Sequence, residues 1–332
     1  MTEPELSIVI VNWNGKSFLP DCLRSIVENP PRGPYEVIVV DNASTDGSAE
    51  WLRSDECTGM MEKTICHVLE PGANLGFGPG SNLAIAATTA PNILILNPDT
   101  RILPGAIDRL IETLRSRSRI GMVGPKLYND DGSLQPSVMR QPPSPASIIV
   151  EGLQLDRVLP KRVLANWLFG NHWEHNERRA VPVIAGAAMI CKREMMDQVG
   201  GFDPSIHMYS EEFEWCVRAR RKGWQVYFEP LAGIIHSRGK STGQRWSADE
   251  QMLVVERATM YFENKSFSKL RNLLNGIARL FVLSLHALRW KLQRRDASVL
   301  IDLIKMHLAN CKTLLRPANK AAQREAGEAK HG

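Results

Sequence analysis

The sequence contains few cysteines, no paired cysteine motif and no long apolar run. Its six cysteines are scattered along 332 residues without a C-x-x-C pair or zinc-binding spacing, which argues against a zinc site and a disulfide scaffold. The start TEPELSIVIV has acidic residues where a secretory leader needs basic ones. The longest apolar run, near residues 277–288, is interrupted by Arg279 and His286 and is too short to span a bilayer. We therefore expect a protein of the reducing cytosol.

The apolar content is high enough for a large core, and the charge is unevenly distributed. Hydrophobic residues make up 43% of the chain and charged residues 23%, so we expect one large globular domain with an appendage. Residues 261–332 hold 14 Lys and Arg against 5 Asp and Glu, a net charge of +9. Residues 1–260 hold 27 against 31, a net charge of −4. The C-terminal segment is therefore chemically different from the rest.

Large apolar residues recur every three or four positions from 270 to 288, with Lys and Arg around them, which predicts a basic amphipathic helix or a pair of helices. Two interpretations stay open. In one, the apolar stripe packs on the larger domain or on a second subunit. In the other, the helix lies on an anionic membrane surface. Nucleic acid is not an expected partner, because the basic residues are not interleaved with exposed aromatics and no binding motif accompanies them.

The first 130 residues alternate between apolar β-branched runs and helical patterns. Strands are expected at 6–12, 35–41, 64–69 and 92–97, and helices at 17–28, 46–54, from about 79, and at 104–117. Continuous β-branched runs are typical of strands that are covered on both faces. The pattern predicts an α/β fold with a parallel, doubly wound sheet. Such a sheet binds its ligands beyond the carboxyl ends of the strands.

Two of these strands end in an aspartate. Asp99 follows the strand 92–97 in the sequence Asn97-Pro98-Asp99. Because Mg²⁺ or Mn²⁺ is usually held by one or two carboxylates and the phosphates of a substrate, Asp99 could tether a metal–nucleotide complex, although a plain turn is the alternative. Asp41 ends the strand 35–41 and could accept hydrogen bonds from a nucleobase or ribose.

A glycine-rich turn, Asn74-Leu75-Gly76-Phe77-Gly78-Pro79-Gly80, enters the next helix at a proline. Glycines let the backbone approach a ligand, and helix N-terminal amides attract phosphate. A dinucleotide fingerprint is not expected, because that motif belongs after the first strand, where this chain has Asn12-Trp13-Asn14-Gly15. This weakens a dehydrogenase interpretation.

The second half contributes the candidate catalytic groups. Residues 181–194 predict a strand that carries Gly186, followed by the start of a helix. Glu211, Glu212 and Glu214 open a helix, where acidic side chains are favoured by the helix dipole alone. One of them could instead be a general base, with a pKa raised by burial or by its acidic neighbours. A loop then presents His236, which suits Mn²⁺ and similar ions but is also an ordinary surface residue. Arg238 and Lys240 could bind a diphosphate or simply be solvated.

Taken together, these segments closely resemble the family 2 glycosyltransferases of the GT-A fold, in particular the rhamnosyltransferase type of bacterial surface polysaccharide synthesis. The resemblance covers residues 6 to about 242. Eight motifs in the right order carry it: VNWNG at 11–15, VVDNASTDGS at 39–48, NLGFGPGSN at 74–82, LNPDT at 96–100, AGAAMICKRE at 185–194, GGFD at 200–203, EEFEWCVRAR at 211–220 and HSRGKS at 236–241.

The resemblance implies roles for individual residues. Asp41 would contact the nucleotide base, with Asn74 and Gly76 in the same nucleotide-sugar site. Asp99 would match the last carboxylate of the D-x-D motif and ligate Mg²⁺ or Mn²⁺, whereas Asn97 replaces the first carboxylate and so removes one possible ligand. His236 would complete the metal site.

On the acceptor side, the resemblance implies that Gly186 and Ala187 line the pocket and that Glu212 is the general base. Glutamate stands there in place of the family's aspartate, which leaves Glu211 and Glu214 as competitors. The implied reaction is a direct displacement with inversion and without a covalent intermediate. The expected donor is dTDP-rhamnose, with UDP-galactofuranose, UDP-galactose or another nucleotide sugar as alternatives.

The resemblance also sets expectations for acceptor, location and domains. The acceptor would be a glycan, or a glycan on a polyprenyl carrier, reached by a cytoplasmic or peripheral protein at the inner face of the membrane. Alternatively, the C-terminal helices could form a homo-oligomer instead of binding the membrane. A non-catalytic nucleotide-sugar-binding module and a nucleotidyltransferase are the alternatives from other classes. The expected domains are 1–245 (a nucleotide-binding half, 1–130, and an acceptor half, 131–245), a helical region, 246–316, and a flexible tail, 317–332.

Overall fold

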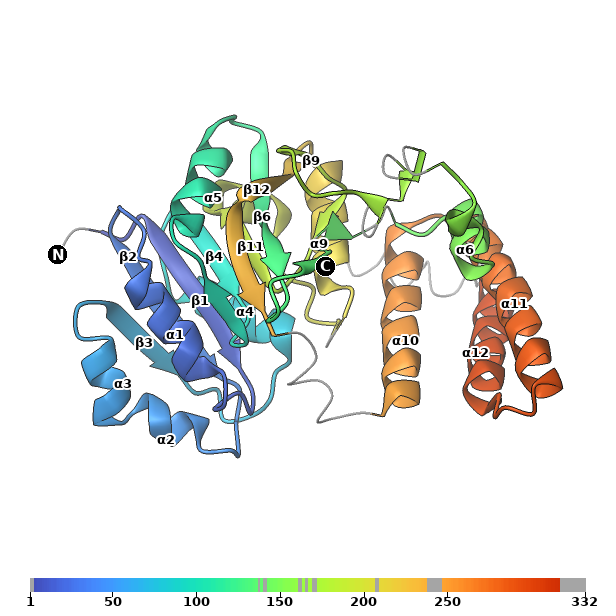
Figure 1. Cartoon of the computed structure of the whole chain (residues 1–332), viewed down its shortest axis with the longest axis horizontal. Coiled ribbons are helices and arrows are strands. Elements are labelled where there is room, and N and C mark those ends of the chain that lie inside the picture. Colours follow the sequence, from blue (N-terminus) through green and yellow to red (C-terminus); the bar gives the residue numbers. More distant parts are fainter. Residues whose placement is uncertain are drawn as a thin grey trace, which may run out of the picture. The chain divides into compact units, whose positions relative to one another are not determined.

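The computed structural model forms two compact units, each described here by itself (Figure 1). Unit 1 comprises residues 1–142 and 160–262, and unit 2 comprises residues 143–159 and 263–332. The structure describes residues 3–136, 138–139, 142–160, 163–164, 167–168, 172–206, 209–237 and 247–316. The expected tail, 317–332, lies outside the described residues. Unit 2 takes a segment, 143–159, from the middle of the region expected to be the acceptor half.

The first half of unit 1 contains the expected parallel strands. β1 (Leu6–Asn12) pairs in parallel with β2 (Tyr35–Asp41) and with β4 (Asn92–Leu96), and β3 (Ile65–Leu69) pairs with β2. The register sets Asn12 opposite Asp41 at the carboxyl ends of β1 and β2. The α/β fold class is therefore confirmed, and the end of the sheet that should bind ligands carries the expected aspartates.

The second half of the sheet differs from a purely parallel arrangement. β11 (Ala188–Lys192) lies antiparallel between β4 and β6 (Ile120–Tyr128). β12 (Gln225–His236) runs parallel to β6 and antiparallel to β5 (Thr100–Ile102), and β7 (Leu134–Gln135) pairs with β6. These antiparallel strands join the expected parallel ones, because β11 arrives from the second half of the chain and its pairing is non-local.

Two local expectations need correction. His236 is the last residue of β12 and not part of a loop. The segment 181–194, expected to be one strand before a helix, divides into β10 (Val183–Ile184), β11 and the start of α8 (Arg193–Val199). β10 pairs with β8 (Val138–Met139), and β9 (Arg179–Ala180) pairs with β12. The break between β10 and β11 places Gly186 and Ala187 in a turn.

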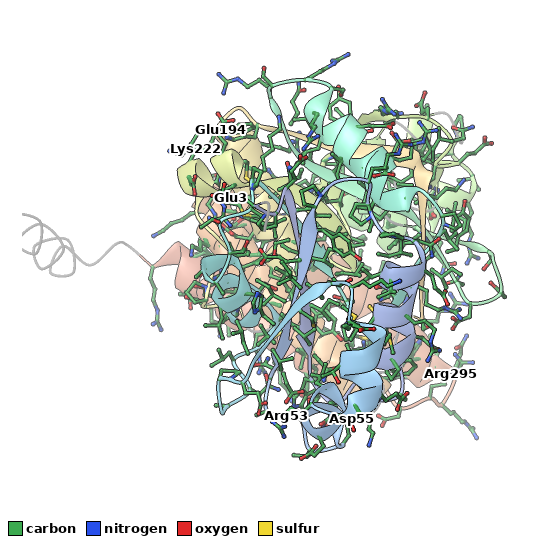
Figure 2. All side chains as sticks on the ribbon, turned by 90° about the vertical axis from the view of Figure 1, so that its left-hand side faces the viewer. Glu3, Arg53, Asp55, Glu194, Lys222 and Arg295 are labelled. Carbon is green, nitrogen blue, oxygen red and sulfur yellow. The ribbon has the colours of Figure 1, made fainter. Side chains whose placement is uncertain are left out.

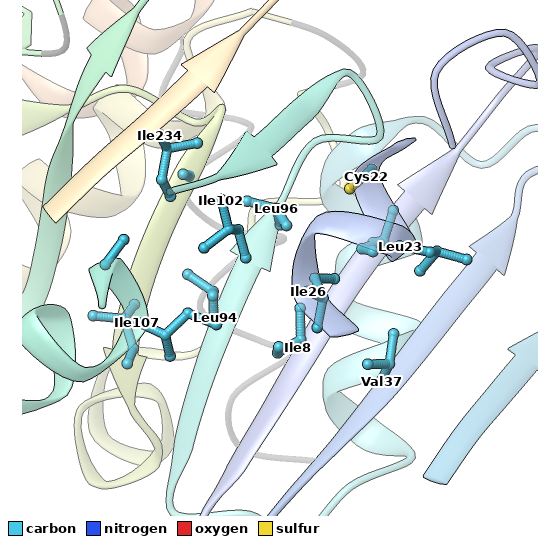
Figure 3. Packing of buried hydrophobic residues seen from close by; sticks show 14 of the residues in the cluster. Ile8, Cys22, Leu23, Ile26, Val37, Leu94, Leu96, Ile102, Ile107 and Ile234 are labelled. Atoms are coloured by element: carbon cyan, nitrogen blue, oxygen red, sulfur yellow. The ribbon is translucent and has the colours of Figure 1, made fainter. Parts of the chain in front are cut away.

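Helices cover both faces of the sheet. Leu, Ile and Val side chains of the strands pack on one face against α1 (Leu19–Glu28), α2 (Ser48–Leu52), α3 (Asp55–Met60) and α5 (Ala106–Arg115). Figure 3 shows this core, with Leu23 and Ile26 of α1 beside Ile8 and Val37. The opposite face packs against α4 (Phe77–Ala86), α8 and α9 (Glu211–Arg221). Charged side chains such as Arg53, Glu194 and Lys222 lie on the outside (Figure 2).

Unit 2 is helical. It contains α6 (Pro145–Gly152), the 3₁₀ helix η1 (Leu155–Arg157), α11 (Lys269–Leu292), α12 (Ser298–Leu315) and the last residues of α10 (Ala248–Ser266). α11 packs against both α6 and α12. A Cβ atom on Gly152 would lie 2.5 Å from Cγ1 of Val282, and one on Gly276 would lie 2.6 Å from Sγ of Cys311. These helices therefore approach closely through glycine.

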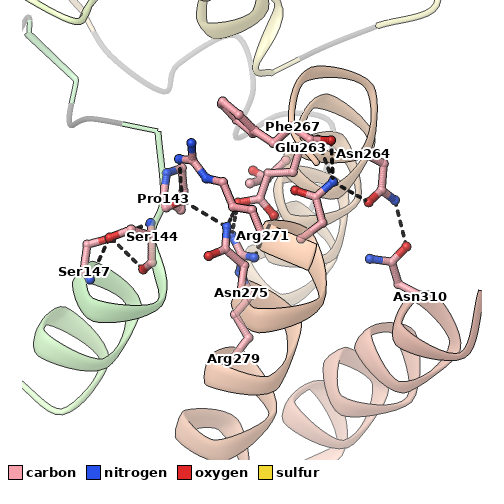
Figure 4. Close-up of polar contacts among 12 residues, drawn as sticks. Pro143, Ser144, Ser147, Glu263, Asn264, Phe267, Arg271, Asn275, Arg279 and Asn310 are labelled. Carbon is pink, nitrogen blue, oxygen red and sulfur yellow. Dashed lines mark hydrogen bonds and ion pairs between the residues drawn. The ribbon is translucent and has the colours of Figure 1, made fainter. Parts of the chain in front are cut away.

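A buried polar cluster joins the end of α10 to α11 (Figure 4). Arg279 Nη1 donates to Glu263 Oε2 at 2.8 Å, and Asn275 Nδ2 donates to Glu263 Oε1 at 3.0 Å. Arg279, which interrupts the apolar run in the sequence, thus pairs with Glu263 inside unit 2. Within the described residues, no helix combines the length and the apolar character needed to span a membrane.

Candidate functional site

The carboxylate of Asp41 is held rigidly at the end of β2. Asn12, opposite it on β1, donates from Nδ2 to Asp41 Oδ1 at 2.9 Å and to Ser44 Oγ at 3.2 Å. The backbone N–H of Ser44 donates to Asp41 Oδ2 at 3.1 Å. Asp41 is only 2% exposed. Sequence analysis assigned no role in this site to Asn12, the last residue of β1, or to Ser44, which lies in the loop after β2.

The loops after β1 and β2 contain non-glycine residues in the left-handed region. Asn14 has φ of 52° and Ala43 has φ of 60°. The N–H of Asn14 donates to Ser44 Oγ at 2.9 Å, and the N–H of Thr45 donates to Asn14 Oδ1 at 2.7 Å. Such backbone strain persists where the surroundings over-determine it, and it concentrates at ligand sites. The two loops are therefore locked together beside Asp41.

The glycine-rich turn is attached to the end of β2. Asn42 Nδ2 donates to Asn74 Oδ1 at 3.0 Å, and the N–H of Leu75 donates to Asn42 Oδ1 at 2.9 Å. The N–H of Gly76 donates to Asn74 Oδ1 at 2.9 Å. Asn74 and Gly76, both expected in the nucleotide-sugar site, thus lie next to the residue that follows Asp41.

The next two glycines of that turn have a packing role. A Cβ atom on Gly80 would lie 3.0 Å from Cγ1 of Val11, and one on Gly78 would lie 3.0 Å from Cβ of Phe202. Side chains at these positions would push α4 away from the sheet. At these two positions, the glycines therefore allow segments of the chain to pack closely against each other.

Asp99 and His236 form a second group at the same end of the sheet. Thr100 and His236 are register partners between β5 and β12, which places Asp99 beside His236. Asp99 Oδ1 lies 3.4 Å from Nε2 of His236, with 4% and 12% of the two side chains exposed. The N–H of Ser237 donates to the carbonyl of Asp99 at 2.9 Å. The structure thus brings together two groups separated by more than a hundred positions in the sequence.

Gln135 determines the tautomer of His236. Its Nε2 group donates to Asn129 Oδ1 at 2.8 Å and to the carbonyl of His236 at 3.1 Å, which leaves its Oε1 as the atom facing His236 Nδ1 at 2.6 Å. Nδ1 therefore carries a proton, and neutral His236 presents the lone pair of Nε2 to Asp99. No sequence signal pointed to Gln135, since it lies in a short strand without a motif.

This pair fits a divalent cation. A carboxylate oxygen and an imidazole lone pair that face each other at 3.4 Å are both electron donors, and a cation between them would satisfy both. Among the described residues there is no cluster of three or more His, Cys, Asp or Glu able to hold a metal by itself. A metal at Asp99 and His236 would therefore need further ligands from a substrate, as diphosphate oxygens supply for Mg²⁺.

Gly186, Ala187 and Asn97 connect this edge to α9. The N–H of Asn97 donates to the carbonyl of Ala187 at 2.9 Å, just beyond the end of β4. A Cβ atom on Gly186 would lie 3.7 Å from Cβ and 3.8 Å from Cδ of Glu212. These distances place the side chain of Glu212 directly against Gly186. The expected acceptor-side residues and the expected base are thus neighbours.

The first two glutamates of α9 have raised pKa values. Burial raises the pKa of Glu212 to about 7. Burial, followed by repulsion from Glu212, raises the pKa of Glu211 to about 8. Glu211 is 7% exposed, and its buried Oε2 has no hydrogen-bond partner among the residues that the structure describes. A carboxylate with a pKa near neutrality is suited to accept a proton at physiological pH.

Glu214 has a structural role. Arg218 donates to both of its oxygens, from Nε to Oε1 at 2.8 Å and from Nη2 to Oε2 at 2.6 Å. Arg218 also donates to the carbonyls of Val199 and Gly201, at 2.6 and 2.8 Å. A carboxylate committed to a bidentate arginine is a poor proton acceptor. Arg238 and Lys240, the expected diphosphate contacts, lie outside the described residues.

Comparison with known sequences gives one consistent result. The model of the family described as glycosyl transferase family 2 matches residues 7–200, more than half of the chain. An N-acetylglucosaminyl-diphospho-decaprenol L-rhamnosyltransferase of Mycobacterium tuberculosis is 30% identical over 254 residues, which cover 72% of this chain and 78% of that relative. The low-salt glycan biosynthesis hexosyltransferase Agl10 of Haloferax volcanii is 25% identical over 269 residues, covering 80% and 77%.

Solved structures resemble the chain in fold. The mannosyltransferase PcManGT of Pyrobaculum calidifontis, in complex with GDP-Man and Mn²⁺, aligns with a TM-score of 0.52 at 15% identity and covers 94% of this chain and 87% of its own. A fragment of S. aureus TarS in complex with UDP-GlcNAc aligns with a TM-score of 0.52 at 13% identity, covering 86% and 73%. At these identities the likeness concerns the fold, and it agrees with the expected GT-A class.

Proposed function

This chain belongs to glycosyl transferase family 2, and from that premise we propose that it transfers an L-rhamnosyl group from dTDP-rhamnose to a lipid-linked glycan, with inversion. It is a glycosyltransferase, so the nucleotidyltransferase and the non-catalytic module are no longer needed as alternatives. The rhamnosyl assignment is supported by the relative from Mycobacterium tuberculosis, whose name specifies both the sugar and a decaprenol-linked acceptor.

One observation carries the chemistry: two complementary groups are linked through the backbone hydrogen bond between Asn97 and Ala187. On one side, Asp99 and His236 face each other at 3.4 Å as paired donors to a cation. On the other side, Glu212 lies against Gly186 with a pKa of about 7. A displacement at a sugar carbon needs charge neutralisation at the leaving group and proton removal at the acceptor, and this arrangement offers both.

Each side chain then has a task. Asp41, held by Asn12 and Ser44, accepts hydrogen bonds from the base or ribose of the donor and sets its position. Asp99 and His236 hold Mg²⁺ or Mn²⁺, which neutralises charge on the departing nucleoside diphosphate when bound. Glu212 takes the proton of the acceptor hydroxyl as that oxygen attacks the sugar. Gly186 leaves room for the acceptor beside Glu212.

The acceptor determines where the enzyme works. A glycan on a polyprenyl diphosphate is anchored in the membrane, so the protein would act on it as a peripheral enzyme at the cytoplasmic face. Galactofuranose, galactose and other sugars are the alternative transferred groups.

The test is a donor panel. The purified protein is incubated with Mg²⁺ or Mn²⁺, a polyprenyl-diphosphate N-acetylglucosamine acceptor and, one at a time, dTDP-rhamnose, UDP-galactofuranose, UDP-galactose and GDP-mannose. We expect acceptor-dependent release of dTDP and a product heavier by one deoxyhexose. Release of UDP or GDP with the matching product would replace the rhamnosyl assignment by that sugar, while leaving the glycosyltransferase activity in place.

A further inference from the structure

The outward face of α11 carries a row of large apolar side chains, here called the α11 stripe. Their exposed fractions range from 41% to 76%, for Leu270, Leu274, Ile277, Phe281, Leu285, Leu288 and Leu292. The buried residues of the same helix are mostly small or polar, including Asn275, Gly276, Ala278 and Ala287. A helix of a water-soluble protein normally shows the reverse distribution. A contiguous apolar row of this kind marks an interaction surface.

The spacing of the α11 stripe keeps it straight along the helix. Its members follow one another by four, three, four, four, three and four positions, so that Leu270, Phe281 and Leu292 stand eleven residues apart. An eleven-residue repeat corresponds to 3.67 residues per turn, close to the 3.6 of an undistorted helix. The seven side chains therefore fall within an arc of about 80°. A straight, narrow stripe matches a flat surface better than the left-handed groove of a heptad coiled coil.

The charge on α11 itself has one sign, whereas the exposed Asp296 lies beyond its end. α11 contains no Asp or Glu. Lys269, Arg289 and Lys291 are exposed on it, and Arg294 and Arg295 are exposed just beyond its end, with Arg295 at the outside in Figure 2. An apolar row bordered by cations complements a surface that is apolar below and anionic above.

Two other arginines of α11 do not contribute to this border. Arg279 is paired with Glu263 inside unit 2, and Arg271 Nη2 donates to the carbonyl of Pro143 at 3.0 Å (Figure 4). The cations that face outward are thus concentrated at the two ends of the stripe. Two copies of the stripe packed together would place cationic borders in contact without an acidic side chain of α11 between them, which is unfavourable.

We propose that the α11 stripe docks on an anionic lipid surface, with α11 parallel to the bilayer. The apolar side chains would enter the boundary between headgroups and acyl chains, and the flanking Lys and Arg would contact lipid phosphates. The inference goes beyond the proposed function, since it depends neither on the donor sugar nor on the acceptor. It narrows the membrane interpretation of the C-terminal region to one face of one helix.

The experiment is co-sedimentation of the full chain with vesicles, without donor or acceptor. Vesicles of one part phosphatidylglycerol to two parts phosphatidylcholine are compared with vesicles of phosphatidylcholine alone. We expect the protein to bind the anionic vesicles and to be released by raising the NaCl concentration from about 0.1 M to about 1 M, because the screening length falls from about 10 Å to about 3 Å.

Variants of the α11 stripe give the decisive comparison. Ile277→Gln combined with Phe281→Gln should lower partitioning onto anionic vesicles about tenfold or more, because two exposed apolar side chains are lost from the contact. Its control replaces two apolar residues elsewhere that are more exposed, Val158→Gln with Leu231→Gln, whose exposed fractions are 79% and 66% against 52% and 51% for Ile277 and Phe281. The control should bind as the parent does.

The contribution of the cations that flank the α11 stripe is tested with charge-reversal variants in the same vesicle assay. Arg289→Glu with Lys291→Glu should lower partitioning by more than about 25-fold, since each lost cation contributes about fivefold. Lys63→Glu with Lys222→Glu changes the net charge by the same amount at exposed positions of unit 1 and should have a much smaller effect on partitioning.

Circular dichroism establishes that each variant is folded. If Ile277→Gln with Phe281→Gln loses helix, the variant Leu270→Gln with Leu292→Gln, at the two ends of α11, replaces it.

Three results would overturn the inference. The first is that the parent does not bind anionic vesicles. The second is that the α11 variants bind as well as their controls. The third is that light scattering shows a dimer that the Ile277→Gln and Phe281→Gln variant separates, with no binding to vesicles, which would make the stripe an interface between copies. None of these results affects the donor-panel test.

Discussion

Glu212 is the residue whose replacement tests the proposed chemistry most directly. Glu212→Gln removes the carboxylate and keeps the size and the hydrogen-bonding capacity of the side chain. Burial raises the pKa of Glu212 to about 7, whereas burial and the charge of Glu212 raise the pKa of Glu211 to about 8. The two carboxyl groups titrate as a pair, so near neutral pH one carboxylate of the pair is available to accept a proton. Glu212, which lies against Gly186, is the member that we assign to this role.

The expected loss of turnover follows from these pKa values. A general base works only when ionised, so turnover of the parent enzyme should fall about tenfold per pH unit below pH 7. At pH 5 only about 1% of Glu212 would remain ionised, given its pKa of about 7. Glu212→Gln should lower transfer by about 10²–10⁴, or about 3 to 5 kcal/mol of transition-state stabilisation, and should flatten the acid side of the pH profile.

The assay is steady-state release of nucleoside diphosphate between pH 5 and pH 9, with donor binding measured separately by calorimetry. Donor affinity should be unchanged, because in the proposed mechanism Glu212, which lies against Gly186, acts on the acceptor. Glu214→Gln is the matched control: it breaks the ion pair with Arg218, so it should lower the Tm while leaving the pH profile of the folded enzyme in place. The assignment is wrong if Glu212→Gln turns over normally, or if Glu211→Gln is the variant that loses activity and its pH dependence.

The remaining predictions concern the other parts of the molecule. EDTA should abolish sugar transfer, and added Mg²⁺ or Mn²⁺ should restore it. Asp99→Ala or His236→Ala should weaken the metal-dependent binding of the nucleoside diphosphate. Full activity in excess chelator would contradict the proposed metal site. Asp41→Asn should raise the KM for the donor by about 10- to 150-fold with little change in kcat, since a charge-assisted hydrogen bond contributes about 1.5–3 kcal/mol. An unchanged KM would exclude the role. Because the folded-state pKa of Glu211 lies above the ordinary 4.5, the folded protein binds more protons, and the free energy of unfolding should decrease as the pH rises from about 4.5 to about 8. Glu211→Gln should lessen that decrease in chemical denaturation, and an equal decrease in both proteins would refute the assignment. Deleting residues 263–332 should lower the Tm or cause aggregation, because α6 loses its contact with α11, and a deletion protein as stable as the parent would show that α6 does not need it.

The strands of the first hundred residues could be predicted because their signal is local. Runs such as SIVIV and VIVV remain continuous only where a strand is covered on both faces, and the sheet buries them in this way. β11 could not be placed from its own sequence, since its antiparallel position between β4 and β6 depends on the route of the chain after residue 145. The same holds for His236, which looks like a loop residue until β5 and β12 are paired.

The sequence by itself determined the kinds of groups present and their order: aspartates at two strand ends, three glutamates on one helix turn, and a basic helix with an apolar row. These are local properties of composition and spacing. Only the tertiary structure decided which groups act together. In the folded chain, Asn12 donates a hydrogen bond to Asp41, and Arg218 donates to Glu214. Gln135 contacts His236 and orients its ring toward Asp99. The tertiary structure also leaves the α11 stripe exposed while Arg279 is buried. Each of these outcomes depends on contacts between distant segments, and a pattern of neighbouring residues carries no information about which distant segment will pack beside it.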